Sequence, residues 1–125
     1  MQKIGNVCLD ETYYPGEDLY SDGAVEERLL ELAEEYGDGD YHKAIVKERE
    51  WAVMYHMAHE RGNILSWYPF GEGAKILEVG SGCGAVTGAL AAKAGSVTCI
   101  DLSKRRSTIN ALRNQKRDNI KIYVG

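Results

Sequence analysis

A glycine-rich turn preceded by an acid is the part of this sequence best suited to chemistry. Residues 78–84 read Glu-Val-Gly-Ser-Gly-Cys-Gly and follow an apolar run at residues 75–79 that is typical of a β-strand. Glycines let the backbone turn sharply and approach a ligand with no Cβ in the way, and the start of a following helix offers unpaired N–H groups. The pattern predicts a loop that binds a nucleotide-like cofactor.

Spacing alone leaves two classes of cofactor open. Gly80, Gly82 and Ala85 also match the fingerprint of dinucleotide-binding enzymes, so a nicotinamide or flavin enzyme fits the glycines. Glu78 favours the other class, because its carboxylate would repel a pyrophosphate but suits the ammonium group of an aminoacyl sulfonium ligand. Cys83 reads as a small residue between glycines, and nothing in the sequence pairs it with a base that would make it a nucleophile.

The segment ILEVGSGCGAVTGALA resembles motif I of class I S-adenosylmethionine-dependent methyltransferases, in which an acid is followed after one residue by alternating glycines. The resemblance continues through VTCIDLS, where Asp101 stands twenty-one residues after Gly80. In that family this acid accepts hydrogen bonds from both ribose hydroxyls, which suits a carboxylate. A dinucleotide enzyme would use the acid similarly, and a helix N-cap, by Asp101 or by Ser103, is the structural alternative.

The resemblance implies S-adenosyl-L-methionine as the cofactor. The residues that we expect to bind it are Glu78, Gly80, Ser81, Gly82, Cys83, Gly84, Asp101, Leu102 and, from the segment ahead of the loop, Tyr55.

The loop must be positioned by alternating strands and helices. β-prone runs at residues 75–79, 96–100 and 120–124 alternate with helical stretches at residues 85–94 and 104–117. Such alternation predicts parallel βαβ units with right-handed crossovers, and thus an α/β fold in which helices precede a β-α-β-α-β unit. Residues 71–125 would form the first half of a Rossmann-like domain, the 3-2-1 half of the family's seven-stranded sheet.

Residues 1–70 are predicted to be a mostly helical segment that packs on or covers the cofactor site. Residues 1–23 read as irregular, and Ser21 or Asp22 can cap a helix that ends near Gly37. Further helical stretches are expected at residues 41–60 and 63–68.

Aromatic and histidine residues are dense between residues 51 and 63. For Tyr55, core packing is the alternative to cofactor contact. His56 and His59 lack a third ligand, so no metal site is predicted. Together with motif I, the stretches YYPGEDLYSDG and REWAVMYHMAHERGNILSWYPF resemble bacterial methyltransferases found alongside glycosyltransferases of surface-polysaccharide synthesis. That resemblance implies a glycan or other small molecule as the methyl acceptor.

Composition restricts the class of protein. With 44% hydrophobic and 27% charged residues, the chain resembles an ordinary globular domain. A net charge of −4, with the acids gathered early, argues against a nucleic-acid partner, and the basic residues between 104 and 117 are expected on a solvated helix face. Three cysteines without a CxxC pair predict neither disulfides nor zinc, and no apolar run approaches the roughly 20 residues of a membrane span. We expect a cytoplasmic protein.

The half sheet has consequences for activity and assembly. Strand 75–79, central in the family, would lie at an exposed edge and could pair with another chain, so self-association is expected there. Substrate contacts and the base come from later residues in the family, so we assign no catalytic residue and expect this chain alone to be inactive. The alternatives are a non-catalytic interaction or regulatory module with the same fold, or a fragment of an NAD(P)-dependent oxidoreductase.

Overall fold

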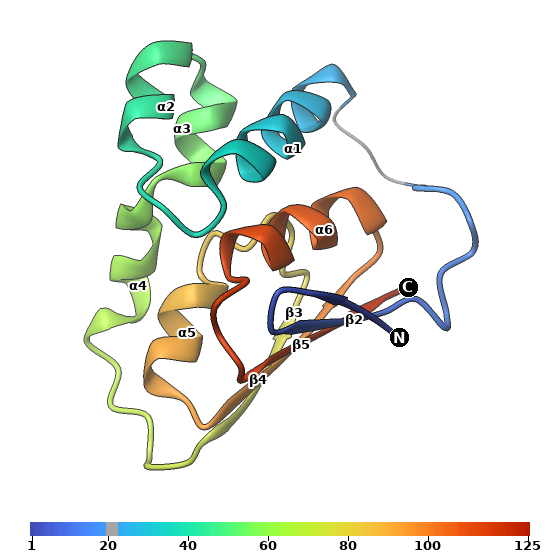
Figure 1. The fold of residues 1–125 in the computed structure, drawn as a ribbon. Coiled ribbons are helices and arrows are strands. Elements are labelled where there is room, and N and C mark those ends of the chain that lie inside the picture. Colours follow the sequence, from blue (N-terminus) through green and yellow to red (C-terminus); the bar gives the residue numbers. More distant parts are fainter. Residues whose placement is uncertain (20–22) are drawn as a thin grey trace.

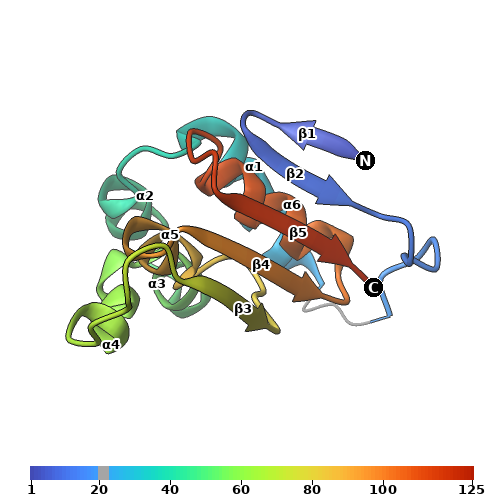
Figure 2. The ribbon, with the colours of Figure 1, turned by 90° about the horizontal axis from the view of Figure 1, so that it is seen from below.

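A single five-stranded sheet forms one layer of the molecule, and helices cover one of its faces (Figure 1). The computed structural model describes residues 1–19 and 23–125. The strands are β1 (Gln2–Ile4), β2 (Val7–Asp10), β3 (Lys75–Val79), β4 (Ser96–Asp101) and β5 (Ile120–Val124), in the order β1-β2-β5-β4-β3. β1 and β2 are antiparallel, and all other neighbours are parallel. Figure 2 shows the sheet from its uncovered side.

The predicted α/β fold is confirmed. β3, β4 and β5 are joined by α5 (Thr87–Lys93) and α6 (Lys104–Arg113), and the order β5-β4-β3 is the expected 3-2-1 arrangement. Along β5 the residues at alternate positions are buried against α5 and α6, as the two-residue period of a strand requires. Both helices are shorter than predicted, because the glycine turn extends into residues 85 and 86 and α6 ends before residue 114.

The prediction that residues 1–23 are irregular is wrong for the first ten residues. β1 and β2 form a hairpin whose turn contains Gly5 at φ 57°, and β2 extends the sheet by pairing in parallel with β5. Val7 and Leu9 are fully buried, and Leu9 lies opposite Ile122. Strands of three and four residues are too short for their alternation to be distinguished from a loop in sequence.

The front helices lie against the two helices that cover the sheet (Figure 1). They are α1 (Ala24–Tyr36), α2 (His42–Glu48), α3 (Trp51–Met57), the 3-10 turn η1 (His59–Gly62) and α4 (Asn63–Ser66). α1 lies over α6, and η1 and α4 lie beside α5. α1 ends before Gly37, as predicted, whereas the proposed caps Ser21 and Asp22 lie outside the described residues. The expected helix at 41–60 is divided, because Arg49 adopts a left-handed φ of 54° and Glu50 is extended.

The basic face predicted for α6 is partly turned inward. Arg106 Nε donates to Glu26 Oε2 on α1 at 2.7 Å, and the side chain of Glu26 is buried. β3 lies at the sheet edge, as expected, with Leu77 and Val79 exposed at 60% and 74%. The sheet is thus covered on one face and open along β3.

Candidate functional site

The glycine loop, residues 80–84, leaves the end of β3 and leads to α5. The amide nitrogens of Gly80 and Ser81 donate to the carbonyl of Ile100 at 2.8 and 3.3 Å, which fixes the loop against the end of β4. Gly80 and Gly82 have φ values of 69° and 55°, and a Cβ added to either would meet no atom within 4 Å. The loop is therefore anchored on its inner side and open on its outer side, where a ligand could approach the backbone.

Asp101, the last residue of β4, connects this loop to α6. Its Oδ2 accepts from the amide of Gly82 at 2.8 Å, and its Oδ1 accepts from the amide of Ser103 at 2.9 Å. The N-cap of α6 is Ser103, whose side chain accepts from the amide of Arg106. Because each carboxylate oxygen can accept more than one hydrogen bond, Asp101 retains acceptor capacity for a ligand.

Glu78 lies at the start of a chain of hydrogen bonds beneath the loop. Its Oε2 accepts from Thr87 Oγ1 at 2.6 Å and from Cys99 Sγ at 3.4 Å. Thr87 Oγ1 in turn accepts from Asn110 Nδ2 at 3.1 Å, and Asn114 Nδ2 donates to Asn110 Oδ1 at 2.9 Å. We call Glu78, Thr87, Asn110 and Asn114 the polar chain. Burial raises the pKa of Glu78, although the hydrogen bond from Thr87 opposes that shift.

Sequence reasoning missed the supporting members of the polar chain. Thr87 and Asn110 are fully buried on α5 and α6, at positions where an amphipathic helix would place apolar residues. A polar residue on the inner face of each predicted helix was the available signal. Gly84 belongs to the same contact, because a Cβ there would lie 2.6 Å from Cγ of Asn110. The third glycine of the motif is thus required by helix packing.

The remaining predicted residues differ in burial and in their distance from the loop along the fold. Cys83 is buried, and burial raises the pKa of its thiol to about 12, so it is not a thiolate nucleophile. Ser81 is buried in the loop, and Leu102, which follows β4, is 60% exposed. Tyr55 lies on α3, where its ring stacks on Trp51 at 4.7 Å between centroids, and the Arg61 guanidinium lies 4.1 Å from its ring centroid.

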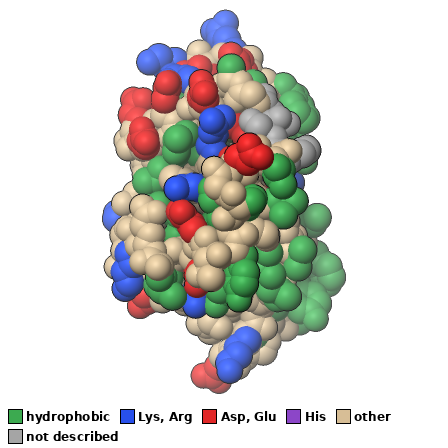
Figure 3. Space-filling view, turned by 90° about the vertical axis from the view of Figure 1, so that its right-hand side faces the viewer, with side chains coloured by type: hydrophobic (Ala, Val, Ile, Leu, Met, Phe, Trp, Pro, Cys, Tyr) green, Lys and Arg blue, Asp and Glu red, His purple; other side chains and the backbone are tan. Residues whose placement is uncertain are grey.

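The structure therefore brings together the loop, Glu78, Asp101 and Leu102 at the carboxyl ends of two adjacent parallel strands, while Tyr55 belongs to a separate helical element. In an open parallel sheet this end is where ligands bind. Figure 3 views the molecule from the side toward which the strands point, and hydrophobic side chains gather along the lower right of that face.

Ionisation of Glu78 is expected to lower stability, and Glu78→Gln tests this. A carboxyl whose pKa is higher in the folded than in the unfolded chain costs nothing below the unfolded pKa, and its full cost is present above the folded pKa. The unfolding free energy of the Gln variant, relative to the parent chain, should therefore increase from pH 4 to pH 8 in urea titrations.

Glu48→Gln is the matched control with the opposite sign. The hydrogen bond from Arg28 lowers the pKa of Glu48, so the parent chain gains stability from that carboxylate as pH rises. The Glu48→Gln difference should become less favourable over the same range. Two differences that move in the same direction would contradict the assignment of Glu78 as a carboxyl with a raised pKa.

Comparison with solved structures gives the fold a clear counterpart. The chain aligns with phosphoethanolamine N-methyltransferase 1 from Haemonchus contortus, in complex with phosphoethanolamine and S-adenosylhomocysteine, at a TM-score of 0.53 and 22% identity over 85% of this chain. The chain has a methyltransferase-like fold. It spans only 22% of the length of that enzyme.

Two further structures align with this chain at lower similarity. One is a predicted S-adenosyl-L-methionine-dependent methyltransferase from Methanococcus maripaludis, with a TM-score of 0.47 and 22% identity over 85% of this chain and 44% of that one. The other is a predicted RNA methyltransferase from Pyrococcus horikoshii, with a TM-score of 0.46 and 16% identity over 80% of this chain and 50% of that one. Neither the protein-family models nor the curated proteins searched give a match.

The described part of the chain has neither a membrane-spanning helix nor a cluster of metal ligands. None of its helices combines the length and apolar character needed to cross a membrane. Nor do residues 1–19 and 23–125 bring together three His, Cys, Asp or Glu side chains that could hold a metal ion.

Proposed function

We propose that this chain binds S-adenosyl-L-methionine at the glycine loop and forms the cofactor-binding part of a methyltransferase. The observation that supports it most is that Glu78 and Asp101 lie on either side of an open glycine loop. They stand at the ends of adjacent strands in a methyltransferase-like fold. The cofactor would supply a methyl group bonded to a positively charged sulfur.

The residues of the loop fit such a ligand. The space outside Gly80 and Gly82 admits a ligand against the backbone, and Asp101 would accept from the ribose hydroxyls. Glu78 would attract the ammonium group, and that positive charge would favour the ionised carboxylate over the neutral form that burial favours. We assign Ser81, Cys83, Gly84 and Leu102 to the same site, with Gly84 acting through its contact with α6. The helices of residues 1–70, with Tyr55, would cover it.

The direct test is a proton–nitrogen NMR titration with S-adenosylhomocysteine, with NAD as the parallel control. We expect saturable shifts at the amides of Gly80, Gly82 and Asp101 with the sulfur compound alone. Asp101→Ala should weaken binding about tenfold, because a ribose contact and the anchor of Gly82 are both lost.

Asp118→Asn, a change of equal charge in the turn before β5, should leave the affinity unchanged. Binding of NAD at the same amides would instead favour the oxidoreductase alternative, and no shift with either compound would reject cofactor binding by this chain.

The edge of β3 favours a second proposal, association with another polypeptide or a second copy of this chain. The strand has no neighbour on one side among the described residues, and its own residues Leu77 and Val79 are exposed. Sedimentation should show an associated species that Leu77→Lys reduces. A monomer at all concentrations, with no change in the variant, would oppose self-association.

For the acceptor we propose a glycan or other small molecule, and for the compartment the cytoplasm. Both proposals rest on the sequence alone. Activity toward candidate glycans in a chain extended beyond Gly125 is the measurement that bears on the acceptor, and a lack of methyl transfer to any of them would reject it.

A further inference from the structure

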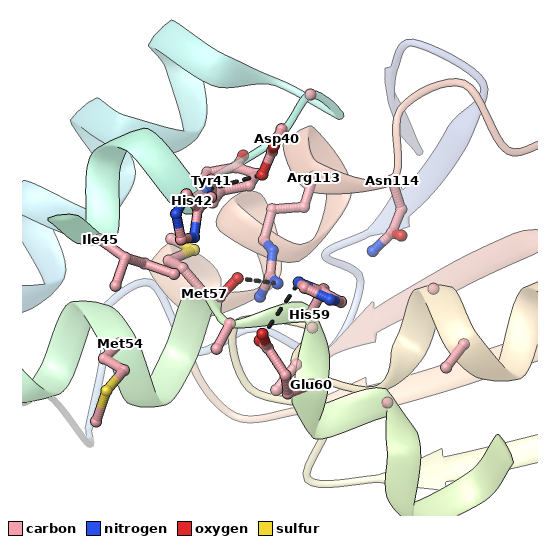
Figure 4. A pocket seen from close by; sticks show the side chains of 17 residues that line it. Asp40, Tyr41, His42, Ile45, Met54, Met57, His59, Glu60, Arg113 and Asn114 are labelled. Carbon is pink, nitrogen blue, oxygen red and sulfur yellow. Dashed lines mark hydrogen bonds and ion pairs between the residues drawn. The ribbon is translucent and has the colours of Figure 1, made fainter.

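A hollow of about 790 Å³ lies between the front helices and the two helices that cover the sheet (Figure 4). This volume is within the range of small-molecule pockets. Its walls come from residues 39–45, from α3 and η1, from the start of α5 and from the end of α6. Gly84 is the one residue that this lining shares with the predicted cofactor residues, so the hollow is distinct from the crevice at the strand ends.

Arg113 extends from the end of α6 toward the interior of this hollow (Figure 4). Its Nη1 donates to the carbonyls of His56 and Cys83 at 2.6 and 2.9 Å, and its Nη2 lies 3.5 Å from the carbonyl of Met57. The guanidinium carbon lies 5.4 Å from the centre of the Tyr41 ring. Carbonyl oxygens and a ring therefore surround the positive charge.

No ion pair joins Arg113 to a carboxylate among residues 1–19 and 23–125. Burial lowers the pKa of Arg113, and the nearby Arg61 lowers it further. A charge removed from water without a counter-ion is costly, and carbonyl dipoles offset that cost only in part. Arg113 thus carries a positive charge at the wall of the hollow with no carboxylate paired to it in the described part of the chain.

Two acids also line the hollow, and the contacts recorded for each are with groups other than Arg113. Asp40 Oδ1 accepts from the amide of His42 at 2.8 Å, and Glu60 Oε2 lies 3.3 Å from His59 Nδ1 at an exposed position. Asn114 adds an amide to the lining, while Ile45, Met54, Met57 and Ala89 provide apolar wall. A ligand with one anionic group and an apolar body would match both parts of this surface.

We propose that this pocket binds a small organic anion, with a phosphate or carboxylate group placed against Arg113 and an apolar body against the Ile45 and Met57 wall. The guanidinium has five N–H donors. Nη1 uses two of them on the carbonyls of His56 and Cys83, and Nη2 uses one on the carbonyl of Met57, which leaves Nε–H and the second Nη2–H for a ligand oxygen. The same residue ties α3 and the glycine loop to α6, so an anion here would lie next to the junction of these elements.

The test uses phenyl phosphate and benzoate as the two anionic probes, and phenol as the neutral one, at constant ionic strength. Proton–nitrogen spectra of the whole chain should show saturable shifts at the amides of Gly62, Gly88 and Asn114 with at least one anion. Arg113→Gln should weaken that binding at least tenfold. Arg105→Gln removes an equal charge from α6 at a residue that faces Glu27 instead, and it should bind as the parent chain does.

Because Arg113 also joins three elements, a second pair of variants leaves it in place. His42→Glu and His42→Gln differ by one charge at an exposed residue that lines the hollow. The Glu variant should bind the anion several-fold more weakly than the Gln variant. The proposal is overturned if neither anion gives saturable shifts, if phenol binds as well as they do, or if all these variants bind alike. Cofactor binding reports at Gly80 and Gly82, so the two proposals can fail separately.

Discussion

Gly84→Ala is expected to lower the free energy of unfolding by about 4 kcal/mol, whereas Gly80→Ala should lower it by only about 1 kcal/mol. Gly84 and Gly80 have positive φ values of 79° and 69°, so an alanine at either position would be under similar backbone strain. They differ in their surroundings: a Cβ on Gly84 would overlap the buried amide of Asn110, and a Cβ on Gly80 would meet nothing within 4 Å. The excess cost therefore measures packing of the loop against α6.

Urea unfolding followed by circular dichroism would measure both variants under the same conditions. A domain of this size is stable by about 5–15 kcal/mol, so a loss of about 4 kcal/mol is a large fraction of the total. Equal losses in the two variants would show that strain alone fixes the glycines, and that the contact between Gly84 and Asn110 does not constrain the loop.

Thr87→Val is expected to cost about 3 kcal/mol, because an almost isosteric change leaves the buried Asn110 amide and the partly buried Glu78 carboxyl without this partner. Thr87 Oγ1 donates to Glu78 and accepts from Asn110. Thr87 and Asn110 are fully buried, and Glu78 is partly buried. The hydrogen bond from Thr87 also lowers the pKa of Glu78, so its loss should raise that pKa further.

Thr108→Val is the matched control on the neighbouring helix. Thr108 Oγ1 donates to the carbonyl of Lys104 within α6 at a more exposed position, so its removal should cost well under 1 kcal/mol. Unfolding free energies and the carboxyl carbon resonance of Glu78 across a pH series would test both effects. A Thr87→Val variant as stable as Thr108→Val, with an unchanged Glu78 titration, would contradict the role assigned to the polar chain.

The strands and loop of residues 75–124 could be predicted because their signals are local. Alternating apolar runs, the glycines after β3 and the acid that ends β4 each stand within a few residues of the feature they specify. The hairpin of β1 and β2 could not, because its place in the sheet depends on β5, more than a hundred residues later.

The candidate site likewise contains residues that could be predicted from the sequence and residues that could not. Glu78, Gly82 and Asp101 are motif positions that the fold brings together, whereas Thr87 and Asn110 acquire their importance only through contacts between α5 and α6. Arg113 is the clearest example of a residue whose environment the sequence does not predict. In sequence it belongs to a basic stretch that predicts a solvated face, yet its guanidinium is bound to carbonyls of α3 and of the glycine loop.

The parallel pairing of β2 with β5 constrains how the chain reaches its native state. Leu9 and Ile122 are partners, so this part of the sheet closes a loop that includes nearly the whole polypeptide. Such long-range pairing is slow to form, since the entropy of the intervening chain must be lost first. On a ribosome, which synthesises the amino end first, Val7 and Leu9 stay without their final partners until β5 has emerged. The hairpin is thus synthesised more than a hundred residues before the strand that completes its burial.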